Sequence, residues 1–150
     1  MKKAIVIFTL FCSLSSIAQS YVSLEVGGSG GLGSINYENT FITKSNFSGY
    51  YRVGFSFAPI DKNNGVALIF PLMIHELIGS SDHKIDLGIG PSLSITTKGN
   101  VFTLMAISAG YRFQPQNKNY YIRIAYTPIV SFMVDFQVQH WAGLCFGYKI

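Results

Sequence analysis

The chain has 150 residues and a formal net charge of +4, with charged residues at only 12% and aromatic residues at 15%. The charged share is about half that of an ordinary soluble domain, which argues against a conventional secreted globular protein. After the N-terminal segment, no apolar stretch reaches the ~20 residues that a membrane helix needs. High apolarity without a spanning helix is typical of a transmembrane β-barrel.

The N-terminal segment has the pattern of a secretory signal peptide. Two lysines precede a mostly apolar run, and Ser16-Ile17-Ala18 fits the small-x-small sequence before a cleavage site. A membrane anchor is the alternative, but the run is shorter than the ~20 residues needed to span a bilayer. We therefore expect a signal peptide over residues 1–18 and a mature domain over residues 19–150.

Cleavage would change the charge and the cysteine content. Without Lys2 and Lys3, nine basic residues face seven acidic ones, a balance too slight to imply nucleic acid as a partner. Cys12 leaves with the signal, so Cys145 remains as the single cysteine and an internal disulfide is excluded.

Alternation of apolar and polar residues marks successive strands, because a strand turns neighbouring side chains to opposite faces. Residues 21–28 and 32–41 alternate around the run Gly28-Ser29-Gly30-Gly31, which leaves open whether they form two strands or one kinked strand. The register of residues 66–78 is ambiguous because both faces are apolar, and residues 129–136 are expected to form a mixed loop. The later strands are expected at residues 50–58, 66–78, 84–96, 101–113, 119–128 and 137–150.

Counting the first region as two, the chain has eight strands joined by short links with no helix between them. Short links without helical crossovers require neighbouring strands to pair antiparallel. Eight is the smallest number of strands in bacterial outer-membrane barrels. The predicted fold class is therefore all-β: an eight-stranded antiparallel up-and-down transmembrane β-barrel after a cleaved signal peptide.

The polar face of these strands is rich in Gly, Ala and Ser, with scattered charges of both signs. A surface facing water would carry more Lys, Glu and Thr, whereas small residues and a few charges suit a narrow lumen filled by side chains. Buried charges need partners, and three acids can pair with three arginines. We expect a structural charge network in the lumen from Glu25, Glu38, Arg52, Asp86, Arg112 and Arg123.

Aromatic residues of the outward-facing parity fall near one end of several strands, if the N-terminus starts in the periplasm. Aromatic girdles at a membrane boundary have this placement. The predicted girdle consists of Tyr37, Tyr51, Tyr111, Phe113, Tyr120 and Tyr148.

With these features in place, the chain resembles the small eight-stranded bacterial outer-membrane β-barrels, the group that includes the OmpA membrane domain and OmpX, and within it a subgroup of uncharacterised barrels with short loops. The phrases that carry the resemblance lie at residues 33–38, 51–55, 83–90 and 110–114, together with the final Phe146-Gly147-Tyr148-Lys149-Ile150. The resemblance implies insertion by the barrel-assembly machinery, although the last residue is Ile150 rather than an aromatic. It implies no catalytic residues.

Candidate chemistry is sparse. His75-Glu76 lacks the spacing of a zinc-binding helix, His83 is expected in a turn, and His140 beside Trp141 is expected at the membrane interface. Gly27–Gly31 is followed by neither Lys-Ser/Thr nor a helix, so it is not a phosphate loop. We expect no catalytic residue, no metal and no cofactor.

The sequence therefore predicts a monomeric outer-membrane barrel, bound to outer-membrane lipid, with an envelope-structural or interaction role. Two alternatives stay open: a soluble exported β-barrel that binds an apolar ligand, and an outer-membrane lipid-modifying enzyme. Pro71 and Pro91 lie inside expected strands and each lacks an amide donor. A bulge or a local break is expected at each.

Overall fold

The structure is a computed structural model that describes residues 19–61, 65–132 and 136–150. The expected signal peptide lies outside these residues. The strands are β1 (Ser20–Val26), β2 (Gly33–Lys44), β3 (Phe47–Asp61), β4 (Gly65–Ile78), β5 (His83–Thr96), β6 (Val101–Phe113), β7 (Tyr120–Tyr126), β8 (Ile129–Ser131), β9 (Gln137–Gln139) and β10 (Ala142–Lys149), and one 3-10 turn, η2, covers Gly28–Gly30.

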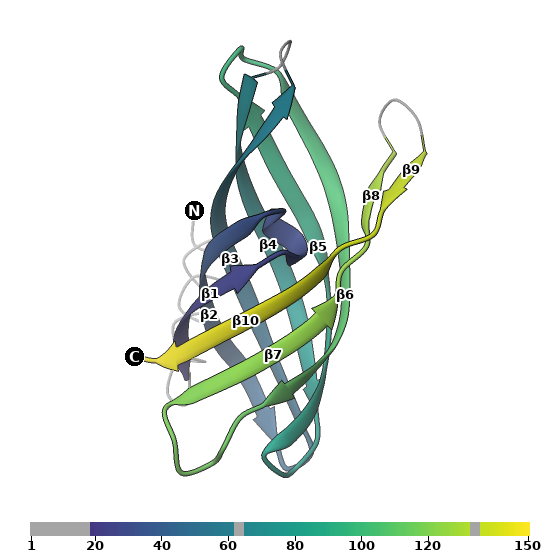
Figure 1. Cartoon of the computed structure of the whole chain (residues 1–150). Coiled ribbons are helices and arrows are strands. Elements are labelled where there is room, and N and C mark those ends of the chain that lie inside the picture. The colour runs from purple at the N-terminus through teal and green to yellow at the C-terminus, as the bar shows by residue number, and fades with distance from the viewer. Residues whose placement is uncertain (1–18, 62–64, 133–135) are drawn as a thin grey trace, which may run out of the picture.

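Eight of these strands close into a barrel (Figure 1). Strands β1 to β6 each pair antiparallel with the next strand in sequence, and β10 closes the ring by pairing with both β7 and β1. The predicted eight-stranded antiparallel up-and-down barrel is confirmed. The start of β1, the end of β10 and the turns at residues 45–46, 79–82 and 114–119 lie at one end, which we call the lower rim.

The region of residues 21–41, for which the sequence left open two strands or one kinked strand, forms two strands, β1 and β2, separated by η2, in agreement with the count of eight. Two later parts of the strand prediction need correction. The segment expected as a mixed loop contains β8, which pairs with both β6 and β9. The expected final strand of residues 137–150 is split into β9 and β10, so a small β8–β9 hairpin leaves the barrel wall near the upper rim (Figure 1).

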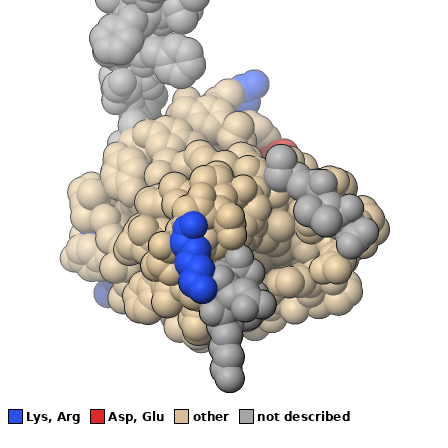
Figure 2. Space-filling view, turned by 90° about the horizontal axis from the view of Figure 1, so that it is seen from above, with Lys and Arg blue, Asp and Glu red and all other residues tan. Residues whose placement is uncertain are grey.

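The two faces of the wall differ sharply in chemistry. Along β1 and β10, buried and exposed residues alternate one by one, as the pleat of a strand requires. The exposed positions carry large apolar side chains, among them Leu24, Phe55, Ile74, Ile124 and Leu144. Seen from above, the described surface shows only isolated charged residues (Figure 2). Among the described residues no helix has the length and apolarity needed to cross a membrane.

The two prolines interrupt pairing without shifting it. The β3–β4 ladder skips from the pair Val53–Leu72 to the pair Ser56–Ile69, and the β4–β5 ladder skips from Pro71–Ser92 to Ile74–Ile89. The register is the same on both sides of each gap, so the expected local break is present and a bulge is not. The register shifts of these ladders lie elsewhere, at Thr40/Ile42 and Pro59/Asp61.

The wall is uneven in height. Strands β3 to β6 rise above β1, β2, β7 and β10 at the top of Figure 1. The pairing of β2 with β3 begins at Ser34–Ser56, so residues 57–61 of β3 pair only with β4. The upper part of the barrel is therefore an open sheet of four strands above a closed ring of eight.

Candidate functional site

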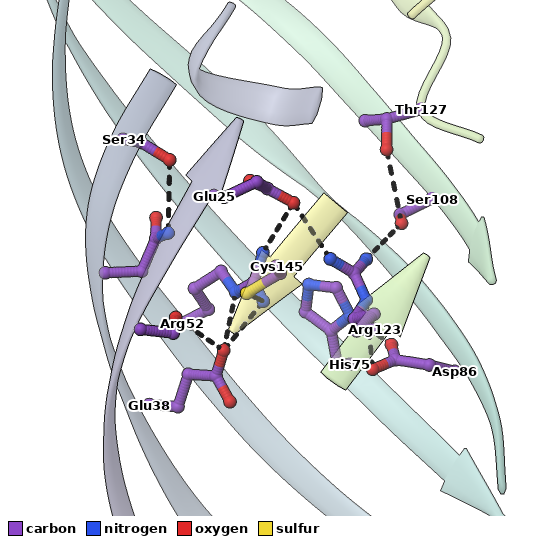
Figure 3. Close-up of polar contacts among 12 residues, drawn as sticks. Glu25, Ser34, Glu38, Arg52, His75, Asp86, Ser108, Arg123, Thr127 and Cys145 are labelled. Carbon is purple, nitrogen blue, oxygen red and sulfur yellow. Dashed lines mark hydrogen bonds and ion pairs between the residues drawn. The ribbon is translucent and has the colours of Figure 1, made fainter. Parts of the chain in front are cut away.

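The structure places all six charged residues of the predicted network inside the barrel (Figure 3 labels five of them). They come from six different strands, and each is at most 2% exposed. Alternation explains this placement, since each charge shares the inward parity of its strand. The three carboxylates and three guanidinium groups balance in formal charge.

Glu38 of β2 is the most heavily bonded of the acids. Arg52 donates to its Oε1 from Nη2 at 2.7 Å and from Nε at 3.0 Å, and Arg112 donates from Nη1 to its Oε2 at 3.1 Å. The hydroxyls of Ser23 and Tyr121 also donate to Oε1. Charge-assisted bonds of this kind are among the strongest in proteins.

The other two acids connect the remaining arginines. Glu25 Oε1 accepts from Arg52 Nη1 at 3.2 Å and from Arg123 Nη1 at 3.0 Å. Asp86 Oδ2 lies 3.1 Å from Arg123 Nε, an ion pair without hydrogen-bond geometry, and 4.0 Å from Arg112 Nη1. The six residues thus form one continuous network across the lumen, and Figure 3 shows the part made by Glu25, Glu38, Arg52, Asp86 and Arg123.

Four further residues that the sequence analysis did not assign to the network complete it. Asp86 accepts a bond from Tyr50 at 2.7 Å and contacts His75 Nδ1 at 2.7 Å, and the ring of Tyr50 stacks on that of His75 at 4.7 Å between centroids. Tyr121 lies under the Arg112 guanidinium, 3.4 Å from its carbon to the ring centroid, and Tyr21 lies at 5.3 Å. Aromatic faces stabilise a desolvated guanidinium.

The alternation of inward and outward positions along each strand accounts for three of these four residues. Tyr21, Tyr50 and Tyr121 share the inward parity of Glu25, Arg52 and Arg123, so alternation along each strand is the signal that places them in the lumen. His75 was hidden because β4 is apolar on both faces, so its register gave no signal. Within the part of the chain described, no group of three or more His, Cys, Asp or Glu is arranged to hold a metal ion.

Glycines make room for the rings of the network. A Cβ at Gly147 would lie 2.1 Å from the Tyr121 ring, and a Cβ at Gly88 would lie 2.4 Å from the His75 ring. Real Cβ atoms do not approach this closely, so β10 and β5 need glycine where these side chains cross the lumen.

Replacing Gly147 with alanine is therefore expected to destabilise the barrel by about 1–3 kcal/mol, the usual cost of overpacking. The measurement is urea unfolding of the refolded protein in lipid vesicles. Gly33→Ala is the matched control, because its Cβ would meet only Glu25 O at an ordinary 3.5 Å. In a Tyr121→Ala background the Gly147→Ala penalty should vanish; a penalty that persists there would contradict this explanation.

The residues of the predicted girdle lie on the outside, toward the lower rim. Tyr37, Tyr51, Tyr111 and Tyr148 are exposed, whereas Phe113 and Tyr120 are partly covered. The rings of Tyr37 and Tyr51 lie 6.4 Å apart. The structure brings neighbouring members together in pairs, such as Tyr120 opposite Tyr148.

Two exposed histidines join aromatic rings outside the barrel. His83 is the first residue of β5 rather than part of a turn, and it contacts the rings of Tyr111 and Phe113. His140 lies between β9 and β10, stacked on Tyr126 at 6.0 Å. The ring hydrogen bonds of these histidines go to the hydroxyls of Tyr111 and Tyr126.

Comparison with known proteins bears on the fold. No family model matches the chain, and no curated protein matches it by sequence. The N-terminal β-barrel domain of Pseudomonas aeruginosa OprF has a similar structure, with 11% identity and a TM-score of 0.58 over 89% of this chain and 96% of that domain. The fold is that of the small eight-stranded outer-membrane β-barrels.

A second solved structure with this barrel is Ail, the attachment invasion locus protein of Yersinia pestis, in complex with the heparin analogue sucrose octasulfate. It is 13% identical with a TM-score of 0.49, and the match covers 89% of this chain and 97% of Ail. The resemblance expected from the sequence is confirmed for the fold by the OprF barrel domain.

Proposed function

We propose that this chain is an integral outer-membrane β-barrel protein whose lumen is closed by the buried ion-pair network, with an envelope-structural or interaction role and no catalytic activity. One observation carries the proposal: large apolar side chains cover the outside of the wall while the six charged residues of the network lie inside. A barrel in water would place its charged residues outside and its apolar residues inside. A barrel in the hydrocarbon of a bilayer needs the opposite arrangement, which is the one seen here.

The same arrangement supports outer-membrane lipid as the surroundings of the barrel. Closed barrels and helices are the structures that satisfy their backbone groups within a bilayer. We further propose insertion by the barrel-assembly machinery and a monomeric state. The closed ring supports a monomer, because its eight paired strands leave no edge along the lower half of the wall for a second copy.

The two alternative functions, a soluble ligand-binding barrel and a lipid-modifying enzyme, require features that differ from those of this lumen. A soluble barrel that binds an apolar ligand throughout its lumen needs an apolar interior, but the lower lumen is filled with charges. A lipid-modifying enzyme needs a nucleophile beside a base. The ring hydrogen bonds of His75, His83 and His140 go to Asp86, Tyr111 and Tyr126 respectively, and none of these is an activated serine.

Cell fractionation with gel electrophoresis tests the proposal. The protein should remain with outer membranes after a carbonate wash, and unheated samples should migrate differently from boiled ones because the intact barrel resists detergent. The purified barrel should give no steady conductance in planar bilayers. Recovery in the soluble periplasm, with no shift on heating, would refute the membrane assignment; a stable open channel would refute closure of the lumen.

A further inference from the structure

A cavity of about 350 Å³ lies in the upper half of the barrel, above the ion-pair network. Its walls come from the inner face of the tall β3–β6 sheet, from η2 and from the segment around Trp141. Apolar side chains dominate these walls, with Ile69, Phe102, Leu104 and Ile129 among them. The volume lies within the ~300–1,000 Å³ of small-molecule pockets.

The wall of the barrel is incomplete at the height of the cavity. Residues 57–61 of β3 pair only with β4, and β6 pairs with β8 only at Met105 and Ala106. Within the described residues, the β6 segment above Met105 therefore pairs only with β5. Among the described residues, neither edge of the tall sheet is paired with a barrel strand at the height of the cavity, and the cavity is bounded there by side chains such as Leu32 and Trp141 rather than by a strand. A molecule that enters from the side would have to pass between these side chains.

The lining excludes charged ligands. Among the described residues, no Lys, Arg, Asp or Glu lines the cavity. Its floor is η2, and the carboxylate of Glu25 lies directly against that turn, 2.6 Å from where a Cβ on Gly28 would be. A carboxylate entering the cavity would lose its hydration without gaining a cation, and it would approach Glu25.

One polar group in the cavity lacks a partner. Ser29 lines the floor, is 2% exposed, and its hydroxyl makes no hydrogen bond in the structure. Its carbonyl oxygen is engaged by the hydroxyl of Ser92 at 3.3 Å. Buried hydroxyls are nearly always hydrogen-bonded, so a ligand that carries a hydroxyl or carbonyl group could satisfy Ser29 Oγ.

We propose that this cavity binds a neutral, largely apolar molecule of the hydrocarbon-chain class, with one hydrogen-bonding group that reaches Ser29. Binding of a free molecule goes beyond the proposed envelope role, whereas binding of an acyl chain rests on the proposed location in the membrane. A free chain such as a fatty alcohol and an acyl chain of a neighbouring lipid share this chemistry.

Intrinsic tryptophan fluorescence can detect binding, because Trp141 lines the cavity and is the single tryptophan of the sequence. The probe is 10-bromodecan-1-ol, whose bromine quenches tryptophan fluorescence at short range. It is titrated into the refolded barrel in detergent micelles, with 10-bromodecanoate at high pH as the charged counterpart. We expect saturable quenching by the alcohol, competed by unlabelled 1-decanol, and affinity at least about tenfold weaker for the carboxylate.

Three variants separate binding in the cavity from partition into the micelle. Ala67→Phe fills the buried wall, and Leu68→Phe places the same ring on the exposed face of the same strand. The first should abolish saturable quenching and the second should leave it unchanged. Ser29→Ala should weaken the affinity for the alcohol about fivefold, as expected for one lost hydrogen bond. The affinity for 1-bromodecane, which has no hydroxyl, should not change.

Folding is checked in every variant by the shift of gel migration on heating, and Ile69→Phe replaces Ala67→Phe if the latter does not fold. Equal quenching of folded wild-type, cavity-filled and control proteins would overturn the proposal. So would a carboxylate that binds as tightly as the alcohol. Neither result would move the protein out of the membrane fraction, so the proposed function is tested separately.

The source of the molecule is resolved in nanodiscs of lipids brominated in their acyl chains. An acyl chain in the cavity quenches Trp141 more in wild type than in Ala67→Phe, and added 1-decanol relieves the difference. A free molecule as the natural ligand leaves the two proteins equally quenched by brominated lipid while the alcohol still binds. The proposal would again be overturned if the alcohol did not bind in micelles and brominated lipid quenched wild type and Ala67→Phe equally, with no effect of added 1-decanol.

Discussion

Replacing Glu38 with alanine is expected to destabilise the barrel by about 3–5 kcal/mol, the cost of breaking a buried ion pair by removing one partner. Glu38 accepts from Arg52 and Arg112, both at most 1% exposed. Without it, three guanidinium groups share two carboxylates inside a closed wall. Urea unfolding in vesicles, followed by the shift of gel migration on heating, measures the loss.

The matched control is Glu76→Ala, which removes the same side chain from an exposed position on β4. Its effect should stay within about 0.5 kcal/mol, the usual range for surface substitutions. Adding Arg112→Met to Glu38→Ala should recover part of the stability, because it removes one unpaired charge. A Glu38→Ala protein as stable as the Glu76→Ala control would show that water or rearranged partners replace the carboxylate.

The charge network could be predicted as a set of residues but not as a set of bonds. Period-two alternation places Glu25, Arg52 and Arg123 inside with no knowledge of the fold. Which arginine meets which acid depends on the stagger of the strands around the ring, and a pair such as Arg123 and Glu25 lies 98 residues apart in the chain. Alternation within one strand carries no information on that stagger.

The limits of alternation also explain His75 and the upper cavity. On β4 both faces are apolar, because Met73 and Leu77 face inward on either side of His75, so the pattern that should have assigned His75 was absent. The cavity exists because β3 to β6 are taller than their neighbours and because β8 departs from the wall after Pro128, which has no amide to donate. Strand ends of this kind depend on pairing between strands, which a single run of residues does not record.

Ile89→Arg is the second substitution with a large expected effect, and it tests which face meets lipid. Ile89 is 55% exposed on β5, between Ile74 of β4 and Ile107 of β6, and both of these are also exposed. An arginine on the lipid face near mid-height costs about 2–4 kcal/mol. We therefore expect slower or failed assembly in vesicles, measured as the fraction of protein that shifts on heating.

Leu87 would be a poorer choice, because its partner on β4 is Glu76, whose carboxylate could pair with a new arginine. The control is Asn117→Arg, which adds the same charge at an exposed turn on the lower rim. That turn lies beyond the apolar band, so assembly should match wild type. If Ile89→Arg and Asn117→Arg assembled equally well, the apolar face would not be in contact with lipid. The exposed aliphatic belt would then need a protein partner to cover it, since water alone would not tolerate so large an apolar surface.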